Sequence, residues 1–173
     1  GCITMTTTAV MVGMAEIHVT KGAGIFTCVG LGSCIGVCAI DPITNVAGCA
    51  QIMLPESIAD KHVDKPAKFA NTGVPELINM MERLGAERSR IVVAIAGGAQ
   101  VFKFGSESAT SRLDIGARNA TAVIETLNRY GLIPRGNDLG GSNGRTVNFT
   151  VESGIVTVRT AVSAEKQLTN LRD

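Results

Sequence analysis

Residues 34–54 read CIGVCAIDPITNVAGCAQIML, two apolar runs joined by the short segment DPITN. Proline and asparagine suit tight turns, so this stretch predicts a β-hairpin. If Ile40 pairs with Asn45, then Cys34 lies directly opposite Gln51 on one face of the hairpin. A shift of one residue would put these two side chains on opposite faces.

The rest of the chain contains further strand patterns and two helical ones. Strands are predicted at residues 16–20, 25–29, 91–96, 147–151 and 155–160. Residues 132–138 are expected to contain a short strand, and Pro134 would keep that strand at a sheet edge. Helices are predicted at residues 69–84, where Pro75 interrupts the helix or starts its second part, and 115–130, between Asp114 as N-cap and Gly131. Residues 100–110 are expected to form a polar loop. Strands at both ends with two helices between them predict an α+β layered domain rather than regular βαβ alternation.

Composition limits the classes of function that this chain can have. Its 173 residues predict a single domain, 1–173, of which residues 1–13 are expected to be disordered or partly left over from expression. A formal charge of +1 and few aromatic residues argue against nucleic-acid binding. Five cysteines are too few for a disulfide scaffold and favour a reducing, cytoplasmic setting. No apolar run approaches the ~18 residues that would span a membrane.

Cys34 is the candidate nucleophile of the sequence. Gly30 and Gly32 precede it closely, so the backbone can bend around the thiol and leave amide groups free to face a ligand. A thiol needs a base or an electropositive setting to ionise near neutral pH. The alternative is that Cys34 is a small buried apolar residue, which is the usual role of a free cysteine.

Other candidate sites carry weaker signals. The cysteines lack a CxxC pair and neither histidine has ligand spacing, which argues against a zinc site. Ile35 occupies the place of the third glycine of a dinucleotide-binding pattern, so that reading fails. His18 and His62 are candidate bases that are more often structural or solvated. The candidates for orienting a substrate amide are three polar residues, Arg118, Asn119 and Arg145.

Seven short blocks, in order, resemble the CheD family of bacterial and archaeal chemotaxis proteins. They are GLGSC at 30–34, DP at 41–42, IMLP at 52–55, DKPAKF at 64–69, AGGA at 96–99, IGARN at 115–119 and DLGG at 138–141. The resemblance runs from near Met14 to near Val162. No single block is decisive, but the ordered set is specific.

This resemblance implies a layered α/β/β sandwich similar to CheD and to deamidating toxins. It implies that Cys34 attacks glutamine side chains of methyl-accepting chemoreceptors and forms a thioester that water hydrolyses to glutamate. Backbone amides near Ser33 and Cys34 are the candidate oxyanion hole. The resemblance also implies binding to CheC, a phosphatase of the phosphorylated response regulator. No cofactor, metal, nucleic acid or membrane insertion is expected.

The chain departs from the family pattern at two candidate catalytic positions. The family histidine is Gln51 here, which cannot take up a proton near neutral pH, and the threonine six residues before the nucleophile is Cys28. Three explanations remain open: a slow or inactive homologue that keeps its binding partners, recruitment of His62 or another base, or an introduced substitution at position 51. The alternative function is a non-catalytic adaptor that binds chemoreceptors and CheC.

Overall fold

The computed structural model describes residues 9–57, 62–100 and 114–173 of the chain. The helices and strands are β1 (Ala9–Met11), β2 (Ile17–Lys21), β3 (Ile25–Leu31), β4 (Ile35–Asp41), β5 (Val46–Ile52), α1 (Ala70–Arg83), β6 (Val92–Gly97), α3 (Ile115–Arg129), β7 (Gly136–Leu139), β8 (Arg145–Thr150), β9 (Ile155–Thr160) and β10 (Lys166–Asn170), with short 3₁₀ turns at Pro66–Lys68 and Arg88–Arg90.

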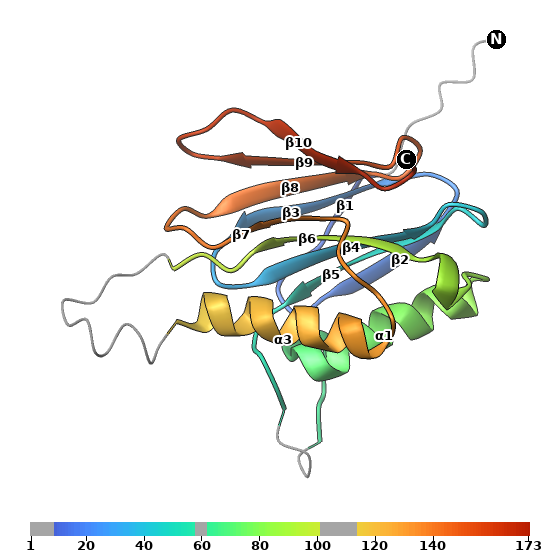
Figure 1. Ribbon diagram of the computed structural model, residues 1–173, viewed down its shortest axis with the longest axis horizontal. Coiled ribbons are helices and arrows are strands. Elements are labelled where there is room, and N and C mark those ends of the chain that lie inside the picture. The colour runs from blue at the N-terminus through green and yellow to red at the C-terminus, as the bar shows by residue number, and fades with distance from the viewer. Residues whose placement is uncertain (1–8, 58–61, 101–113) are drawn as a thin grey trace.

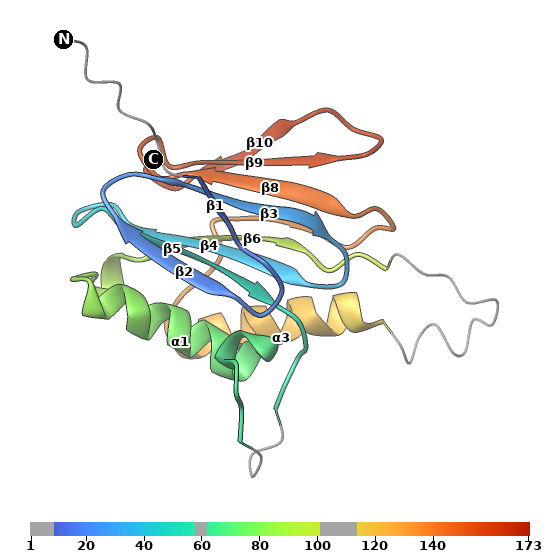
Figure 2. The same cartoon turned by 180° about the vertical axis from the view of Figure 1, so that it is seen from behind.

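The strands form two five-stranded sheets stacked on one another. One sheet has the order β1-β3-β8-β9-β10 and the other has the order β2-β5-β4-β6-β7. Figures 1 and 2 show α1 and α3 side by side on the outer face of the second sheet, with the first sheet on its other face. The predicted α+β class and layered α/β/β arrangement are therefore confirmed.

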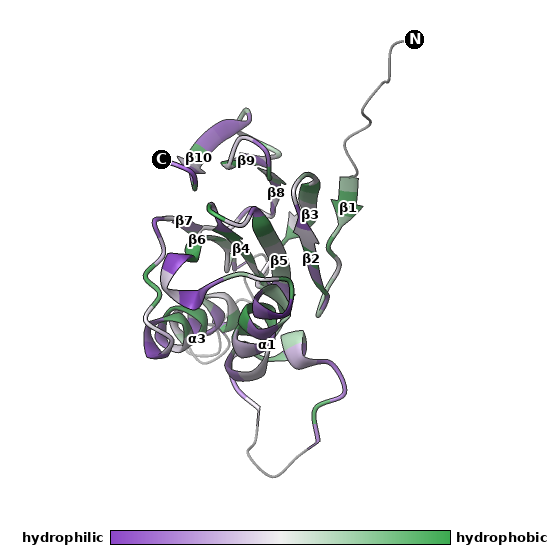
Figure 3. Ribbon diagram, turned by 90° about the vertical axis from the view of Figure 1, so that its right-hand side faces the viewer, coloured by the Kyte–Doolittle hydropathy of each residue, from purple (hydrophilic) through white to green (hydrophobic). Residues whose placement is uncertain are grey.

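Figure 3 shows the helices and the two sheets as three layers. A separate hydrophobic core lies between each pair of neighbouring layers. Between the helices and the second sheet lie side chains such as Val74, Leu77 and Ile78 of α1, packed against the strands. Between the two sheets lie Phe26, Phe149 and most of the cysteines. The central strands β4 and β5 are buried on both faces, which explains their continuous apolar runs.

Both predicted helices are present and their end signals behave as expected in most respects. The Asp114 carboxylate accepts a hydrogen bond from Ala117 N at 3.0 Å, so the N-cap of α3 is confirmed. Gly131 takes a positive φ of 77° just after that helix. The prediction that Pro75 interrupts the first helix is wrong, because α1 continues through it.

The central hairpin exists, but its register differs from the prediction by one residue on each strand. The structure pairs Asp41 with Val46, and therefore Gly36 rather than Cys34 with Gln51. The turn explains the change: the Asp41 carboxylate accepts from Ile43 N at 2.9 Å and thereby closes a loop of residues 42–45. Because the net shift is two residues, Cys34 and Gln51 stay on the same face.

The two sheet edges depart most from the sequence prediction. The strands β1 and β10 were not predicted, and β1 lies within the segment 1–13 that was expected to be disordered. The short edge strand expected near residues 132–138 is present as β7, which pairs in parallel with β6. The predicted loop at 100–110 lies almost wholly outside the described residues. No helix in the described part of the chain is long and apolar enough to cross a membrane.

Candidate active site

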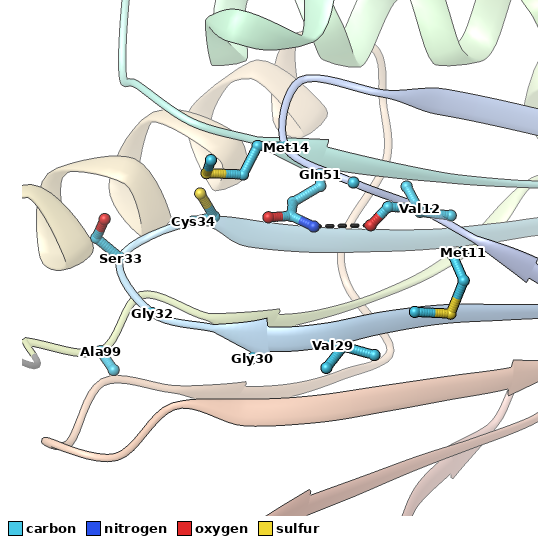
Figure 4. Close-up of a pocket in the computed structure, with 11 residues that line it drawn as sticks. Met11, Val12, Met14, Val29, Gly30, Gly32, Ser33, Cys34, Gln51 and Ala99 are labelled. Carbon is cyan, nitrogen blue, oxygen red and sulfur yellow. Dashed lines mark hydrogen bonds between the residues drawn. The ribbon is translucent and has the colours of Figure 1, made fainter.

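A cavity of about 600 Å³ opens where the ends of β3 and β4 meet the segment after β1. Cys34 and Gln51 both line it, and Figure 4 shows the two side chains on the same side of the sheet. The remaining lining residues are Met11, Val12, Gly13, Met14, Val29, Gly30, Gly32, Ser33 and Ala99. The structure therefore brings Cys34 and Gln51, two catalytic candidates of the sequence, to one cavity.

The backbone carbonyls of the loop before Cys34 are tied to the scaffold behind it. Gly32 O accepts from Ala99 N at 2.8 Å, and Cys34 O accepts from Gly98 N at 3.0 Å. This close approach needs glycine at position 97, where φ is +123° and an added Cβ would lie 2.1 Å from Cys34 O. The AGGA block singled out in the sequence is thus a clamp on the Cys34 loop.

Asn119 of α3 holds the same loop from the helix side. Its fully buried side chain donates to Ser33 O and to Met53 O, each at 2.9 Å. One amide group therefore joins the end of α3 to the Cys34 loop and to the chain leaving β5. The prediction that Asn119 orients a substrate amide gives way to this structural role, because Asn119 does not line the cavity.

Fastening the three carbonyls leaves the amide groups of the loop available. Within the described residues the Ser33 backbone N–H donates to no acceptor, and the Cys34 N–H donates only to its own thiol; both residues line the cavity. Unpaired amides at a cavity wall can stabilise negative charge on a bound oxygen. The Ser33 and Cys34 amides therefore stay the candidate oxyanion hole that the sequence predicts.

Gln51 is fixed by a contact that the sequence did not suggest. Its Nε2 donates to the backbone carbonyl of Val12 at 2.8 Å, and its side chain is 5% exposed. In Figure 4 the amide oxygen of Gln51 turns toward the Cys34 side of the cavity. The segment after β1 thus sets the orientation of the residue at position 51.

Burial disfavours ionisation of the proposed nucleophile. Desolvation, followed by the proximity of the Cys28 thiol, raises the pKa of Cys34, and these effects outweigh the backbone hydrogen bond that favours the thiolate. Burial therefore favours the neutral Cys34 thiol over the thiolate. Gln51 cannot accept its proton, so neither cavity residue supplies a general base.

Cys28 lies beneath this site in the core between the sheets. It is 1% exposed, does not line the cavity, and its Sγ lies 3.7 Å from Cys49 Sγ. Cys38 Sγ lies 3.9 Å from the same atom. Hydrogen bonds with the Cys28 and Cys38 thiols, followed by burial, raise the pKa of Cys49. The three thiols behave as packed apolar groups, and Cys28 presents no hydroxyl in place of the family threonine.

The remaining sequence candidates lie outside the cavity. His18 contacts Glu16 at 3.3 Å, and His62 contacts Asp64 at 3.2 Å in a separate hollow. Arg118 lines another hollow beside Pro55. Arg145 is buried and donates to Asp138 O at 2.6 Å and to Gly140 O, so it fastens the DLGG block rather than facing a substrate.

Removing the Asn119 amide is expected to loosen the Cys34 loop. Asn119→Leu would leave the Ser33 and Met53 carbonyls without donors at a cost of roughly 2–4 kcal/mol of unfolding free energy. Cys34 alkylation by iodoacetamide should accelerate at least severalfold as the loop opens. Thr126→Val is the matched control, since Thr126 bonds only to Ala122 O within α3. An alkylation rate equal to that of the unchanged protein would contradict this role for Asn119.

Comparison with known proteins adds the relatives of this chain. The family described as CheD chemotactic sensory transduction matches residues 53–160. A protein of Desulforamulus reducens named probable chemoreceptor glutamine deamidase CheD is 43% identical over 157 residues, covering 91% of this chain and 93% of the relative. A protein of the same name from Desulfitobacterium hafniense is 45% identical, covering 91% and 96%. Another from Caldanaerobacter subterraneus is 43% identical, covering 86% and 91%.

Proposed function

This chain belongs to the CheD family, and we propose that it hydrolyses glutamine side chains of chemoreceptors to glutamate, with Cys34 as the nucleophile. The observation that carries this proposal is the Cys34 loop itself. Its carbonyls are bonded to Gly98, Ala99 and Asn119, while Ser33 and Cys34 line a cavity. The names of the relatives supply the substrate class. The proposed setting is the cytoplasm.

The chemistry proceeds in two steps. The Cys34 sulfur bonds to the carboxamide carbon, the C–N bond breaks, and the nitrogen leaves as ammonia after taking up the thiol proton. Water then attacks the thioester, releases the glutamate side chain and restores the thiol. The amides of Ser33 and Cys34 would stabilise the oxyanion that forms in each step.

We propose that Gln51 acts as a positioning residue in the place of the family base. Its amide oxygen can accept a hydrogen bond from the thiol or from the substrate amide, but it cannot carry the proton to the leaving group. Loss of a general base typically costs a factor of about 10² to 10⁴ in rate. The expected enzyme is therefore slow.

His62 is a less suitable replacement base. It lies in a hollow that adjoins the cavity only through Met14, and it already contacts Asp64. A catalytic role for His62 would need the segment after β5 to move. The Cys28 thiol cannot contact the substrate, because Cys28 is buried and does not line the cavity.

The decisive experiment measures ammonia release from a purified chemoreceptor cytoplasmic domain. The unchanged protein is compared with Cys34→Ala, and the receptor is examined by mass spectrometry for the 1 Da increase that converts glutamine to glutamate. Release that disappears in Cys34→Ala is the expected result. Equal release by both proteins would remove Cys34 from the mechanism.

A second candidate function follows from the same site. The alternative, prompted by glutamine in place of a base at position 51, is an adaptor that binds chemoreceptors and the CheC phosphatase without turnover. The adaptor reading predicts receptor and CheC binding with no ammonia release from either protein. Binding to CheC is itself part of the proposal, and a pull-down with purified CheC tests it directly.

A further inference from the structure

We propose that Met11, Met14 and Val29 form an apolar rim that docks apolar side chains flanking the target glutamine. This inference rests on the proposed function, because it names the surface by which the deamidated segment reaches Cys34. It assigns to the N-terminal part of the chain a role in choosing the substrate.

The rim is unusual in its exposure. Met11 is 61% exposed, Met14 is 61% exposed and Val29 is 55% exposed, although all three are large apolar side chains. They make up three of the seven exposed large hydrophobic side chains among the residues that the structure describes. All three line the cavity that contains Cys34. Exposed apolar groups gathered at one opening indicate an interaction surface.

The rim comes from two elements that the fold places side by side. Met11 ends β1 and Val29 belongs to β3, which pairs with β1 in parallel. Met14 follows in the segment whose Val12 carbonyl holds Gln51. Figure 4 shows Met14 beside Cys34, with Met11 and Val29 farther along the cavity, so the rim extends away from the thiol along the cavity.

The chemistry of the opening points to an uncharged partner surface. No charged side chain lines the cavity in the described ranges 9–57, 62–100 and 114–173. A charged residue brought against this rim would lose water without gaining an ionic partner. Methionine is flexible and adapts to differently shaped apolar groups, which suits a surface that must accept several target glutamines.

The deamidated segment is the occupant because of where the rim lies. A glutamine side chain is short, so its carboxamide reaches Cys34 only if its own backbone comes to the cavity mouth. The neighbouring residues of that segment must then pass over Met11, Met14 and Val29. Burying these side chains would supply affinity that the small carboxamide cannot supply alone.

The test measures binding, because binding does not depend on the slow chemistry. Met11→Ser, Met14→Ser and the double variant are titrated with a chemoreceptor cytoplasmic domain that carries glutamine at its modification sites. The double variant is expected to bind about 10- to 100-fold more weakly, since two half-exposed methionines lose their apolar contacts. The urea unfolding midpoint of the double variant should match that of the unchanged protein, which excludes damage to the fold.

Ile133→Ser is the matched control. Ile133 is 82% exposed and lies between α3 and β7, outside the cavity, so its replacement should leave receptor affinity unchanged. Receptor affinity unaltered in the double variant would overturn the rim while leaving the deamidase proposal intact. The inference would also be overturned if the unchanged protein self-associated, the double variant did not, and receptor binding were the same for both. That outcome would assign the rim to contact with a second copy of the chain. No receptor binding by the unchanged protein would overturn both proposals.

Discussion

Gln51→His is expected to raise the rate of ammonia release at least severalfold, and by up to about 10²- to 10⁴-fold, the usual contribution of a general base. The physical reason is already built into the site. The side chain at position 51 shares the cavity with Cys34, and the Val12 carbonyl accepts a hydrogen bond from it at 2.8 Å. In the histidine variant that carbonyl would accept one ring N–H and leave the other nitrogen free to take the thiol proton.

The pH dependence of the two proteins separates this mechanism from a general gain in stability. The unchanged protein needs the Cys34 thiolate, whose pKa is raised by burial, so its rate should still be rising above pH 9. A histidine base must be neutral to act, so the variant's rate should rise through about pH 6.5 and then level off. The measurement is ammonia release from pH 5 to 10, with Cys34→Ala subtracted.

Gln51→Met provides the matched control for this experiment. Methionine keeps the length of the side chain but neither accepts a proton nor bonds to Val12, so its rate should not exceed that of the unchanged protein. A folded Gln51→His variant whose rate and pH profile match those of the unchanged protein would argue that position 51 is not the base position. His62 or another group would then become the candidate.

Much of the fold follows from patterns that are local in the sequence. The hairpin, both helices and the Asp114 cap depend on apolar spacing and on turn or capping residues within a few positions. The register of the hairpin depends on which backbone N–H groups donate hydrogen bonds to the Asp41 carboxylate. The spacing of apolar residues does not reveal these partners. The predicted register was wrong by two residues. Because two is an even number, Cys34 and Gln51 were still placed on the same face of the sheet.

The site was predictable only in part for a similar reason. Cys34 stands in a block of the family pattern and Gln51 stands out as a departure from it, whereas the Val12 carbonyl has no side-chain signature and becomes relevant only because β1 pairs with β3. A three-residue strand contains too few positions to show alternation. The missed signal was an apolar cluster near the chain start, including Met11 and Met14, which a disordered segment would have no reason to carry.

The roles of Asn119 and Arg145 illustrate the opposite error. Both polar residues were candidates for orienting a substrate amide, yet both side chains are buried and bond to backbone carbonyls. Sequence patterns cannot distinguish a polar group that faces a ligand from one that holds the loop facing the ligand. Burial distinguishes them, and burial depends on the tertiary fold.

Asp41→Ala is expected to lower the unfolding free energy at neutral pH by roughly 2–4 kcal/mol, because it removes the buried end of an ion pair. Asp41 is fully buried at the end of β4 opposite Cys34. Its carboxylate accepts from Arg90 Nη2 at 3.0 Å and from the backbone amides of Glu87 and Ile43, each at 2.9 Å. Arg90 is 34% exposed and can reach water, which keeps the cost below that of a fully buried pair.

The difference in unfolding free energy between the two proteins should become smaller in acid. Burial alone would raise the pKa of Asp41, but the hydrogen bonds from Arg90, Glu87 and Ile43 outweigh it and hold that pKa well below its usual range. A group whose pKa is lower in the folded state stabilises the protein above its unfolded pKa of about 3.9 and loses that contribution as the pH falls. The loss is at most about 1.4 kcal/mol per pH unit.

Urea unfolding of both proteins at pH 7 and pH 3 tests the sign of this effect, and the gap between them should narrow at pH 3. Glu87→Gln is the matched control, because Glu87 contacts the same Arg90 at 2.6 Å but is 62% exposed. An exposed pair contributes little, so this control should change stability by no more than about 1 kcal/mol. A gap that stays constant or widens in acid would mean that the Asp41 charge does not stabilise the fold, and that its loss acts through the shape of the turn alone.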